Sequence, residues 1–226
     1  YDETFMQLAQ KYRQGMVPFF SETPYVLALT FSEKSEASLQ EKIESYLKKI
    51  PVEAFTIKYV SGIELFETIT EKGFLFSLCE DYTRGAFSIY SGLNDLVVTS
   101  PQIKEALLDI GNHLHIKGLP HILTGAIDVG NISITLLFDK HNEHYGDTLL
   151  RVTQDICAII KEYKGGVSMS SGEGLMRTPF LSYSYSDQII NLFKKIKNVW
   201  DPLGVLNPGK KVGASLTYLK QHIVQK

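Results

Sequence analysis

The chain has 226 residues, of which 44% are hydrophobic and 21% charged, and its formal net charge is −2. This length supports one large domain or two small ones, and the near-neutral charge gives no electrostatic reason to expect nucleic acid or an anionic membrane as a partner. No apolar run approaches the ~20 residues that span a bilayer. The two cysteines, Cys79 and Cys157, are too few for a disulfide framework or a four-thiolate metal site. We therefore expect a cytoplasmic domain with reduced, buried thiols and no transmembrane segment.

The N-terminal third of the chain alternates between strand and helix periodicity. The pattern of residues 25–31 predicts a strand with both faces largely covered. In residues 36–49 apolar side chains recur at helical spacing, which predicts a helix. A second strand is predicted at 55–59. Residues 62–84 have weaker helical character, because Gly73 interrupts the pattern.

The middle of the chain carries one predicted helix and four apolar runs with strand character. The four runs are 86–90, 96–98, 122–129 and 131–138. Ser91 and Gly92 join the first two as a predicted hairpin, and the last run alternates most regularly. The helix is predicted at 102–116, where Pro101 suits its first turn.

The last third predicts two helices and one short strand. A helix at 147–163 is closed by Gly165 and Gly166, and a strand at 167–169 follows it. The final helix, at 186–199, stops before Asp201-Pro202. Its apolar positions, which we expect to face the core, are Ile189, Leu192, Phe193, Ile196 and Val199.

Together these elements predict an α+β fold, in which a mostly antiparallel sheet has helices packed on one face. Two ferredoxin-like strand–helix–strand units, with an intervening hairpin, would build it. The strand at 131–138 should lie inside the sheet. Nothing resembles a linker or a break in composition, so residues 1–226 are interpreted as a single domain.

Considered without any family resemblance, the residues indicate no specific metal, nucleotide or catalytic site. His141 and His144 have a usable spacing for a metal, but they lie in a polar stretch that is typical of a solvated loop. The glycine-rich segments at 125–130 and 172–174 do not form a phosphate-binding fingerprint, so no dinucleotide site is expected on this chain. Without further comparison, the sequence predicts only an α+β domain.

A more specific signal lies near the C-terminus. A helix containing Lys194, Lys195 and Lys197 leads into Trp200-Asp201-Pro202-Leu203-Gly204-Val205-Leu206-Asn207-Pro208-Gly209-Lys210. This ending resembles the "FDP-x-G-x-L-NPGK" segment of FAD-linked oxidoreductases of the glycolate oxidase, D-lactate dehydrogenase and vanillyl-alcohol oxidase type. Asp-Pro would stop the helix, and glycine and proline would shape a tight return of the chain.

Upstream matches to the same family follow in the expected order. They are Tyr25 to Phe31 for the opening strand, Asn94 to Val98 for "ED-x-AVP", Gly125 to Asn131 for "GHxGDGN", and Gly165 to Leu181 for "GGSISGEHGDGR-x-R-x-PFL". The resemblance spans nearly the whole chain and is weakest between residues 52 and 92. It therefore implies the C-terminal domain of such an oxidoreductase.

In this family the domain is a cap that covers the flavin ring and lines the substrate pocket. The resemblance implies that FAD rests mainly on an N-terminal domain, which has no counterpart in these residues, so the isolated chain should be inactive. The expected partners are that domain and a small-molecule substrate.

The candidate cofactor contact is Asn207. The candidate substrate-binding residues are Arg177, Arg84 and Asn131, since a guanidinium can grip a carboxylate with two parallel hydrogen bonds. No catalytic residue is assigned.

The family's metal ligands are replaced in this chain. Where metal-containing members have two histidines and a glutamate, this sequence has Ala126, Ser133 and Ser170. Alanine cannot bind a metal and neutral serines bind divalent ions poorly, so we expect no metal unless nearby side chains substitute. The possible substitutes are Glu173, His121 and Asp128.

A family arginine in "LW-x-x-RE", which holds the substrate carboxylate, is also missing, because the closest matches place Cys79 or Ile69 there. Three interpretations stay open. The chain could belong to an active, metal-independent oxidoreductase acting on a small hydroxy acid or related alcohol. It could instead be a catalytically degenerate binding or regulatory domain of the same fold. It could also be an unrelated α+β domain.

Overall fold

The computed structural model describes residues 31–51, 87–139, 141–142 and 144–223, together with Gln7, Leu27 and Leu29. The predicted strand at 55–59 and the weak helical segment at 62–84 lie outside these residues. So does the predicted strand at 25–31, apart from Leu27, Leu29 and Phe31, which belong to no helix or strand. Arg84 and Cys79 also lie outside them.

Helix α2, Glu36–Leu47, forms where the sequence predicts a helix at 36–49. Ser35 caps it, because its hydroxyl oxygen accepts the backbone N–H of Ser38 at 3.3 Å.

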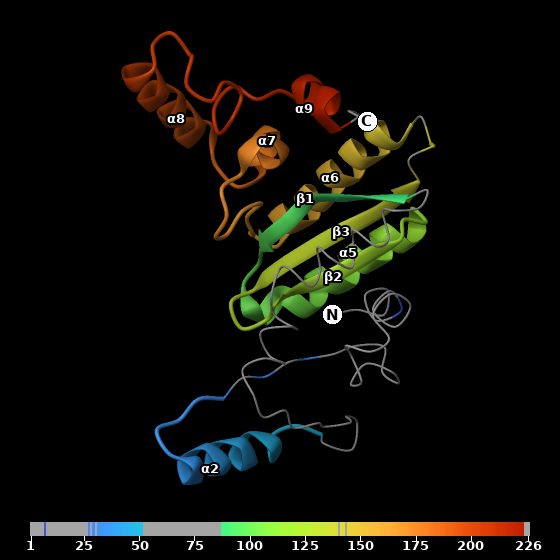
Figure 1. Ribbon diagram of the computed structural model, residues 1–226, viewed down its shortest axis with the longest axis vertical. Coiled ribbons are helices and arrows are strands. Elements are labelled where there is room, and N and C mark those ends of the chain that lie inside the picture. The colour runs from blue at the N-terminus through green and yellow to red at the C-terminus, as the bar shows by residue number, and fades with distance from the viewer. Residues whose placement is uncertain are drawn as a thin grey trace.

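The described residues contain a three-stranded antiparallel sheet in the order β1-β3-β2 (Figure 1). Its strands are β1 (Phe87–Val97), β2 (His121–Ala126) and β3 (Asn131–Asp139). The central strand is the predicted 131–138 strand, and its Ile134 pairs with Leu93 on one side and Leu123 on the other. The α+β class with an antiparallel sheet is therefore confirmed.

Strand β1 replaces the predicted hairpin, which is a correction. Residues 87–97 form one strand, with irregularities in register between Tyr90 and Leu93 and between Leu93 and Leu96. Gly92 does not turn the chain. A Cβ at this position would meet the Tyr90 ring at 2.3 Å, so the glycine leaves room for that ring to lie across the strand. The Tyr90 hydroxyl then accepts a hydrogen bond from the Thr153 hydroxyl at 3.0 Å.

Helices α5 (Ile103–Ile116) and α6 (Tyr145–Glu162) pack against each other, and together with the sheet they build the core. They confirm the helices predicted at 102–116 and 147–163, with η2 (Ser100–Gln102) as a leading 3-10 turn. Core side chains that are fully buried include Ile110, Leu114, Ile132, Ile134, Ile156 and Ile160. Each contributes about 1.5–3 kcal/mol through burial. Cys157 is buried among them, and burial raises the pKa of its thiol to about 12, which fits the expected unreactive thiol.

The strand predicted at 167–169 does not form, which is a second correction, and a single bridge joins Val97 to the preceding Gly166. The two residues exchange backbone hydrogen bonds of 2.9 Å in each direction. After Gly166 the chain does not continue along β1, because the backbone N–H of Val167 donates to the Ser184 hydroxyl and those of residues 169–171 donate to the side chain of Asp95.

The remaining described elements are α7 (Gly174–Arg177), η3 (Thr178–Tyr183), α8 (Asp187–Trp200) and α9 (Leu216–Ile223). Helix α8 forms where predicted, but its apolar face is not turned inward. Ile196 is 51% exposed and Val199 77% exposed, so this part of the prediction is wrong. The reason is its placement: α8 contacts η3 and projects beyond the sheet instead of lying on it (Figure 1). None of the described helices is long and apolar enough to cross a membrane.

Candidate functional site

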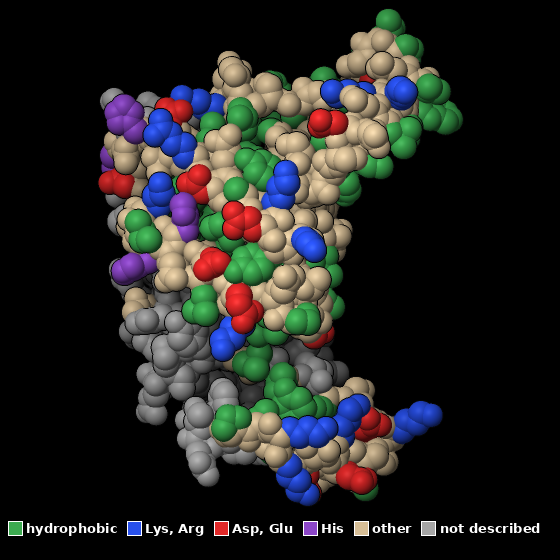
Figure 2. Space-filling model, turned by 180° about the vertical axis from the view of Figure 1, so that it is seen from behind, with side chains coloured by type: hydrophobic (Ala, Val, Ile, Leu, Met, Phe, Trp, Pro, Cys, Tyr) green, Lys and Arg blue, Asp and Glu red, His purple; other side chains and the backbone are tan. Residues whose placement is uncertain are grey.

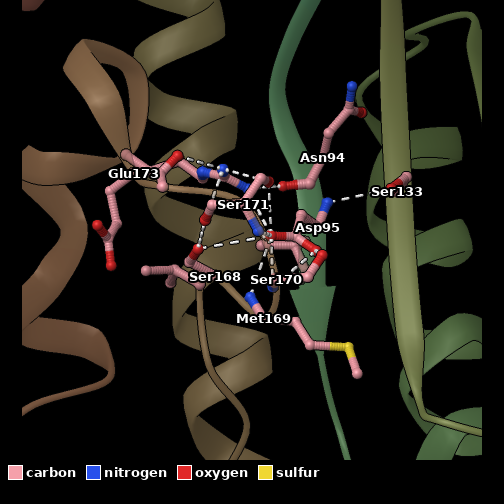
Figure 3. Close-up of polar contacts among 12 residues, drawn as sticks. Asn94, Asp95, Ser133, Ser168, Met169, Ser170, Ser171 and Glu173 are labelled. Carbon is pink, nitrogen blue, oxygen red and sulfur yellow. Dashed lines mark hydrogen bonds and ion pairs between the residues drawn. The ribbon is translucent and has the colours of Figure 1, made fainter. Parts of the chain in front are cut away.

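Asp95 lies at the centre of a polar cluster between β1 and the loop that follows Gly166 (Figure 3). It sits in the second irregularity of β1, and it is only 8% exposed. Its backbone φ is 68°, in the left-handed region that non-glycine residues avoid at a cost of about 1–2 kcal/mol. A bulge in a strand re-aims a side chain, and here it directs the Asp95 carboxylate toward residues 168–171.

Three successive backbone N–H groups donate to this carboxylate. Those of Met169, Ser170 and Ser171 lie 3.1, 3.0 and 2.8 Å from Oδ2. The hydroxyls of Ser170 and Ser171 donate as well, to Oδ1 at 3.0 Å and to Oδ2 at 2.7 Å. Successive N–H groups that converge in this way form a concavity that favours an anion.

Strand β3 completes the cluster from the other side. The Asn131 amide donates to Asp95 Oδ1 at 3.1 Å, and the Ser133 hydroxyl oxygen accepts the backbone N–H of Asp95 at 3.0 Å. Because side chains alternate along a strand, Asn131 and Ser133 point to the face of β3 opposite to Ile132 and Ile134, which pack in the core. The cluster therefore lies on the face of the sheet opposite to the packed core.

Arg177 is the cation of the cluster. Its Nη1 lies 3.5 Å from Asp95 Oδ2, with both side chains about 90% buried. Nη1 also donates to the carbonyl of Asn94, and Nη2 donates to the carbonyl of Gly172 at 2.8 Å and to the Ser171 hydroxyl at 2.9 Å. These are the contacts of a residue that anchors a loop. The carboxylate that Arg177 meets in this structure is that of Asp95.

The protonation of Asp95 follows from two opposing effects. Burial alone raises the pKa of this carboxyl, but the hydrogen bonds from Ser171, Ser170 and Met169 outweigh it and hold the pKa well below its ordinary value. Asp95 is therefore a carboxylate at all physiological pH values.

The predicted site residues are only partly brought together. Arg177 and Asn131, far apart in sequence, both contact Asp95. Asn207 is exposed in the loop after α8, with a left-handed φ of 45°, and Arg84 lies outside the described residues. Substrate binding by Arg177, Arg84 and Asn131 and cofactor binding by Asn207 stay predictions. The sequence interpretation gave no role to Asp95, although one acidic residue inside an apolar strand could have signalled it.

The positions of the family's metal ligands do not fit a cation. Ala126 offers only a methyl group, Ser133 accepts a hydrogen bond from Asp95, and Ser170 donates one to it. The proposed substitutes are placed elsewhere: Glu173 pairs with Lys211 at 2.6 Å, for example. His121 and Asp128 join no metal-binding group either, since within the described part of the chain no three His, Cys, Asp or Glu side chains gather closely enough to hold an ion.

The C-terminal motif has a clear local structure. Asp201 follows α8 directly and is 5% exposed, and its carboxylate accepts the backbone N–H groups of Val205 and Leu206, each at 2.9 Å. Lys197, one turn earlier on α8, forms a salt bridge of 2.5 Å with Asp201. The hydrogen bond from Lys197 comes first among the causes that hold the pKa of Asp201 below its ordinary value. The tight return expected after Asp-Pro is confirmed.

Comparisons with known proteins agree with this architecture. Residues 1–211 match the family model described as "FAD linked oxidases, C-terminal domain". The chain therefore belongs to this family, and its interpretation as an unrelated α+β domain is wrong.

Among similar proteins are two named "D-2-hydroxyglutarate dehydrogenase, mitochondrial". The protein from Danio rerio is 24% identical over 92% of this chain and 38% of its own length, and the one from Arabidopsis thaliana is 24% identical over 95% of this chain and 37% of its own. A "D-2-hydroxyglutarate dehydrogenase" from Stutzerimonas stutzeri (strain A1501) is 30% identical over 52% of this chain and 26% of its own length. The chain thus spans less than two fifths of the length of these relatives.

Proposed function

We propose that this chain is the substrate-side cap domain of an FAD-dependent oxidoreductase that acts on a small hydroxy acid or a related alcohol. The observation that carries the proposal is the family match over residues 1–211. The names of the relatives, which specify a hydroxy acid dehydrogenase, support the substrate class. A bound FAD would accept the hydride from the alcohol carbon.

FAD would be held mainly by a second domain of a longer parent protein. The described residues contain no strand, glycine-rich turn and helix of the kind that binds a dinucleotide. The exposed loop at Asn207 is the candidate contact from this side.

The exposed apolar face of α8 is proposed as the surface that docks on the flavin-binding domain. Hydrophobic side chains continue from this helix into the loop after it, and Figure 2 shows them along the projecting arm, with basic side chains between them. The most exposed are Val199, Trp200, Leu203, Val205 and Leu206, at 59–85%. A contiguous apolar patch of this kind marks an interface, and most of the relatives' length lies outside this chain.

The docking surface is tested in the full-length parent. Val199→Glu should weaken the contact between domains and slow flavin reduction by substrate, because it places a charge in an apolar interface. Leu108→Glu is the matched control, since Leu108 is 57% exposed on α5 and away from the patch. Equal effects of the two substitutions would contradict the assignment.

A metal-independent site is the second part of the proposal. It is supported by the donor set at Ala126, Ser133 and Ser170, where no side chain is free to bind a cation. The acidic substrate would then be held by a side chain, with Arg177 and Arg84 as candidates.

Cytoplasmic localisation remains a prediction, and two of the relatives are named as mitochondrial.

The alternative function is a catalytically degenerate binding or regulatory domain. One observation favours it: Arg177, the best candidate for the substrate carboxylate, already contacts Asp95 and donates to four oxygen atoms of residues 94, 171 and 172. Anaerobic mixing of the purified parent with a panel of 2-hydroxy acids distinguishes the two functions. Bleaching of the oxidised flavin band by one of them supports the oxidoreductase. An unchanged flavin spectrum with every acid, in a parent that holds FAD stoichiometrically, supports the alternative.

A further inference from the structure

Among the residues that the structure describes, the groups in hydrogen-bond or ion-pair contact with the Asp95 carboxylate are all donors. The donors are the N–H groups of residues 169–171, the hydroxyls of Ser168, Ser170 and Ser171, the Asn131 amide and the Arg177 guanidinium. A metal ion needs the opposite, a ring of electron-pair acceptors. The arrangement therefore suits an anion.

The donors also match the shape of a carboxylate. Oδ1 accepts the Asn131 amide and the Ser170 hydroxyl, both from outside β1. Oδ2 accepts the Ser171 hydroxyl and the backbone N–H groups, and it faces Arg177. A single-oxygen anion would leave part of this set unsatisfied.

Most of the set is independent of Asp95. Arg177 is positioned by the carbonyls of Asn94 and Gly172, and the Ser168 hydroxyl closes the loop by donating to the carbonyl of Ser171. Without the Asp95 side chain, these contacts would keep a buried guanidinium and three N–H groups pointing at an empty space. An unpaired buried guanidinium is unfavourable, and N–H groups left without an acceptor add to this effect, so such a space attracts an anion from solution.

We propose that residues 168–171, Asn131 and Arg177 form a carboxylate-binding cage whose occupant is the chain's own Asp95. The cage binds free monocarboxylates when the Asp95 side chain is removed. In the native chain the covalently tethered carboxylate occupies it, because its effective concentration exceeds that of any free acid.

Chemical rescue of Asp95→Gly tests this inference. Glycine adopts the left-handed φ of 68° without strain, so a lower melting temperature of this variant reports the lost carboxylate and not a distorted backbone. We expect formate and acetate, at constant ionic strength, to raise the melting temperature of the variant in a saturable way. Acetamide and sodium chloride should not, because neither supplies a carboxylate.

Lys164→Gly is the matched control. Lys164 is exposed just after α6 and also has a left-handed φ, of 53°, but its side chain is not one of the donors to the Asp95 carboxylate. The melting temperature of the Lys164→Gly variant should not respond to formate, and neither should that of the native chain. A folded Asp95→Gly variant that ignores formate and acetate, or that manganese or zinc stabilises instead, would overturn the proposal.

Asp95→Asn keeps the test decisive if the glycine variant does not fold in plain buffer. Its amide has the shape of the carboxylate but turns one donor toward the other donors, so hydrogen exchange at residues 169–171 should accelerate by more than about tenfold. Formate should not reverse this, because the amide still fills the cage. Unchanged exchange at these residues would contradict the proposal. For the glycine variant, recovery of the fold only with formate or acetate would support it.

Discussion

The backbone N–H of Asp95 donates to the hydroxyl oxygen of Ser133 at 3.0 Å, across β1 and β3. Ser133 is the position where metal-containing relatives, as the resemblance implies, have a histidine. In this chain the Ser133 hydroxyl instead supports the strand irregularity that aims the Asp95 carboxylate. This relationship underlies the first prediction.

The full-length parent should contain no stoichiometric zinc or manganese, even with FAD bound. Metal analysis of the purified protein is the measurement. One equivalent of metal, released when Glu173 or His121 is substituted, would show that other ligands had rebuilt the site.

The isolated 226-residue chain should bind no FAD, because the described residues provide no dinucleotide-binding element. Its absorbance in the flavin bands, measured after incubation with FAD and gel filtration, checks this. Stoichiometric retention of FAD would contradict the proposed division between the two domains.

Arg177→Ala should lower the free energy of unfolding by about 3–5 kcal/mol, because it leaves the Asp95 carboxylate buried without its cation. Arg177→Lys should lower the free energy of unfolding by less than Arg177→Ala, but it should not restore the native value, because lysine lacks the planar guanidinium with its two parallel donors. Urea denaturation gives both values. Lys220→Ala is the control: it breaks an exposed salt bridge with Asp147 and should change stability by less than about 1 kcal/mol.

The stability that the Asp95 carboxylate contributes should decrease as the pH falls. Its folded-state pKa is lowered from the ordinary value of 3.8, so the contribution is fully present above that value and is lost as the pH falls through the lower, folded-state pKa. The difference in unfolding free energy between the native chain and Asp95→Asn should be constant from about pH 5 to 8 and should shrink below pH ~4. A difference that grows on acidification would contradict the assigned ionisation.

Gly165→Ala and Gly111→Ala should have opposite effects. A Cβ at Gly165 would meet the Val97 carbonyl oxygen at 2.3 Å and disturb the bridge that starts the loop of the cage, so we expect a loss of about 1–3 kcal/mol. At Gly111, inside α5, a Cβ meets no atom within 4 Å, and alanine should stabilise the helix by about 0.5–1 kcal/mol. Thermal denaturation of the two variants measures both signs.

Local pattern was sufficient for the helices and the central strand. The repeats that predict α5, α6 and α8 lie within a few turns of chain, and the alternation in β3 lies within nine residues, so neighbouring side chains alone indicate which faces are apolar. The C-terminal motif was equally local, because Lys197 and Asp201 are one helical turn apart. The sequence also located the candidate site, since Asn131, Ser133, Ser170 and Arg177 were all singled out by resemblance.

Only the tertiary structure decided what that site contains. Asp95 is 38 residues from Ser133 and 75 from Ser170, and no local pattern predicts that a strand irregularity will turn its carboxylate toward three successive N–H groups. Side-chain acceptors also explain the missing strand at 167–169, because the N–H of Val167 donates to the Ser184 hydroxyl and that of Met169 to the Asp95 carboxylate instead of to a neighbouring strand. The exposure of α8 was also undetermined, because amphipathic periodicity identifies an apolar face but not the surface that covers it. The sequence thus specifies the chemical groups and the hydrophobic periodicity of each element. Long-range contacts in the tertiary structure decide which partly buried donors meet which acceptor.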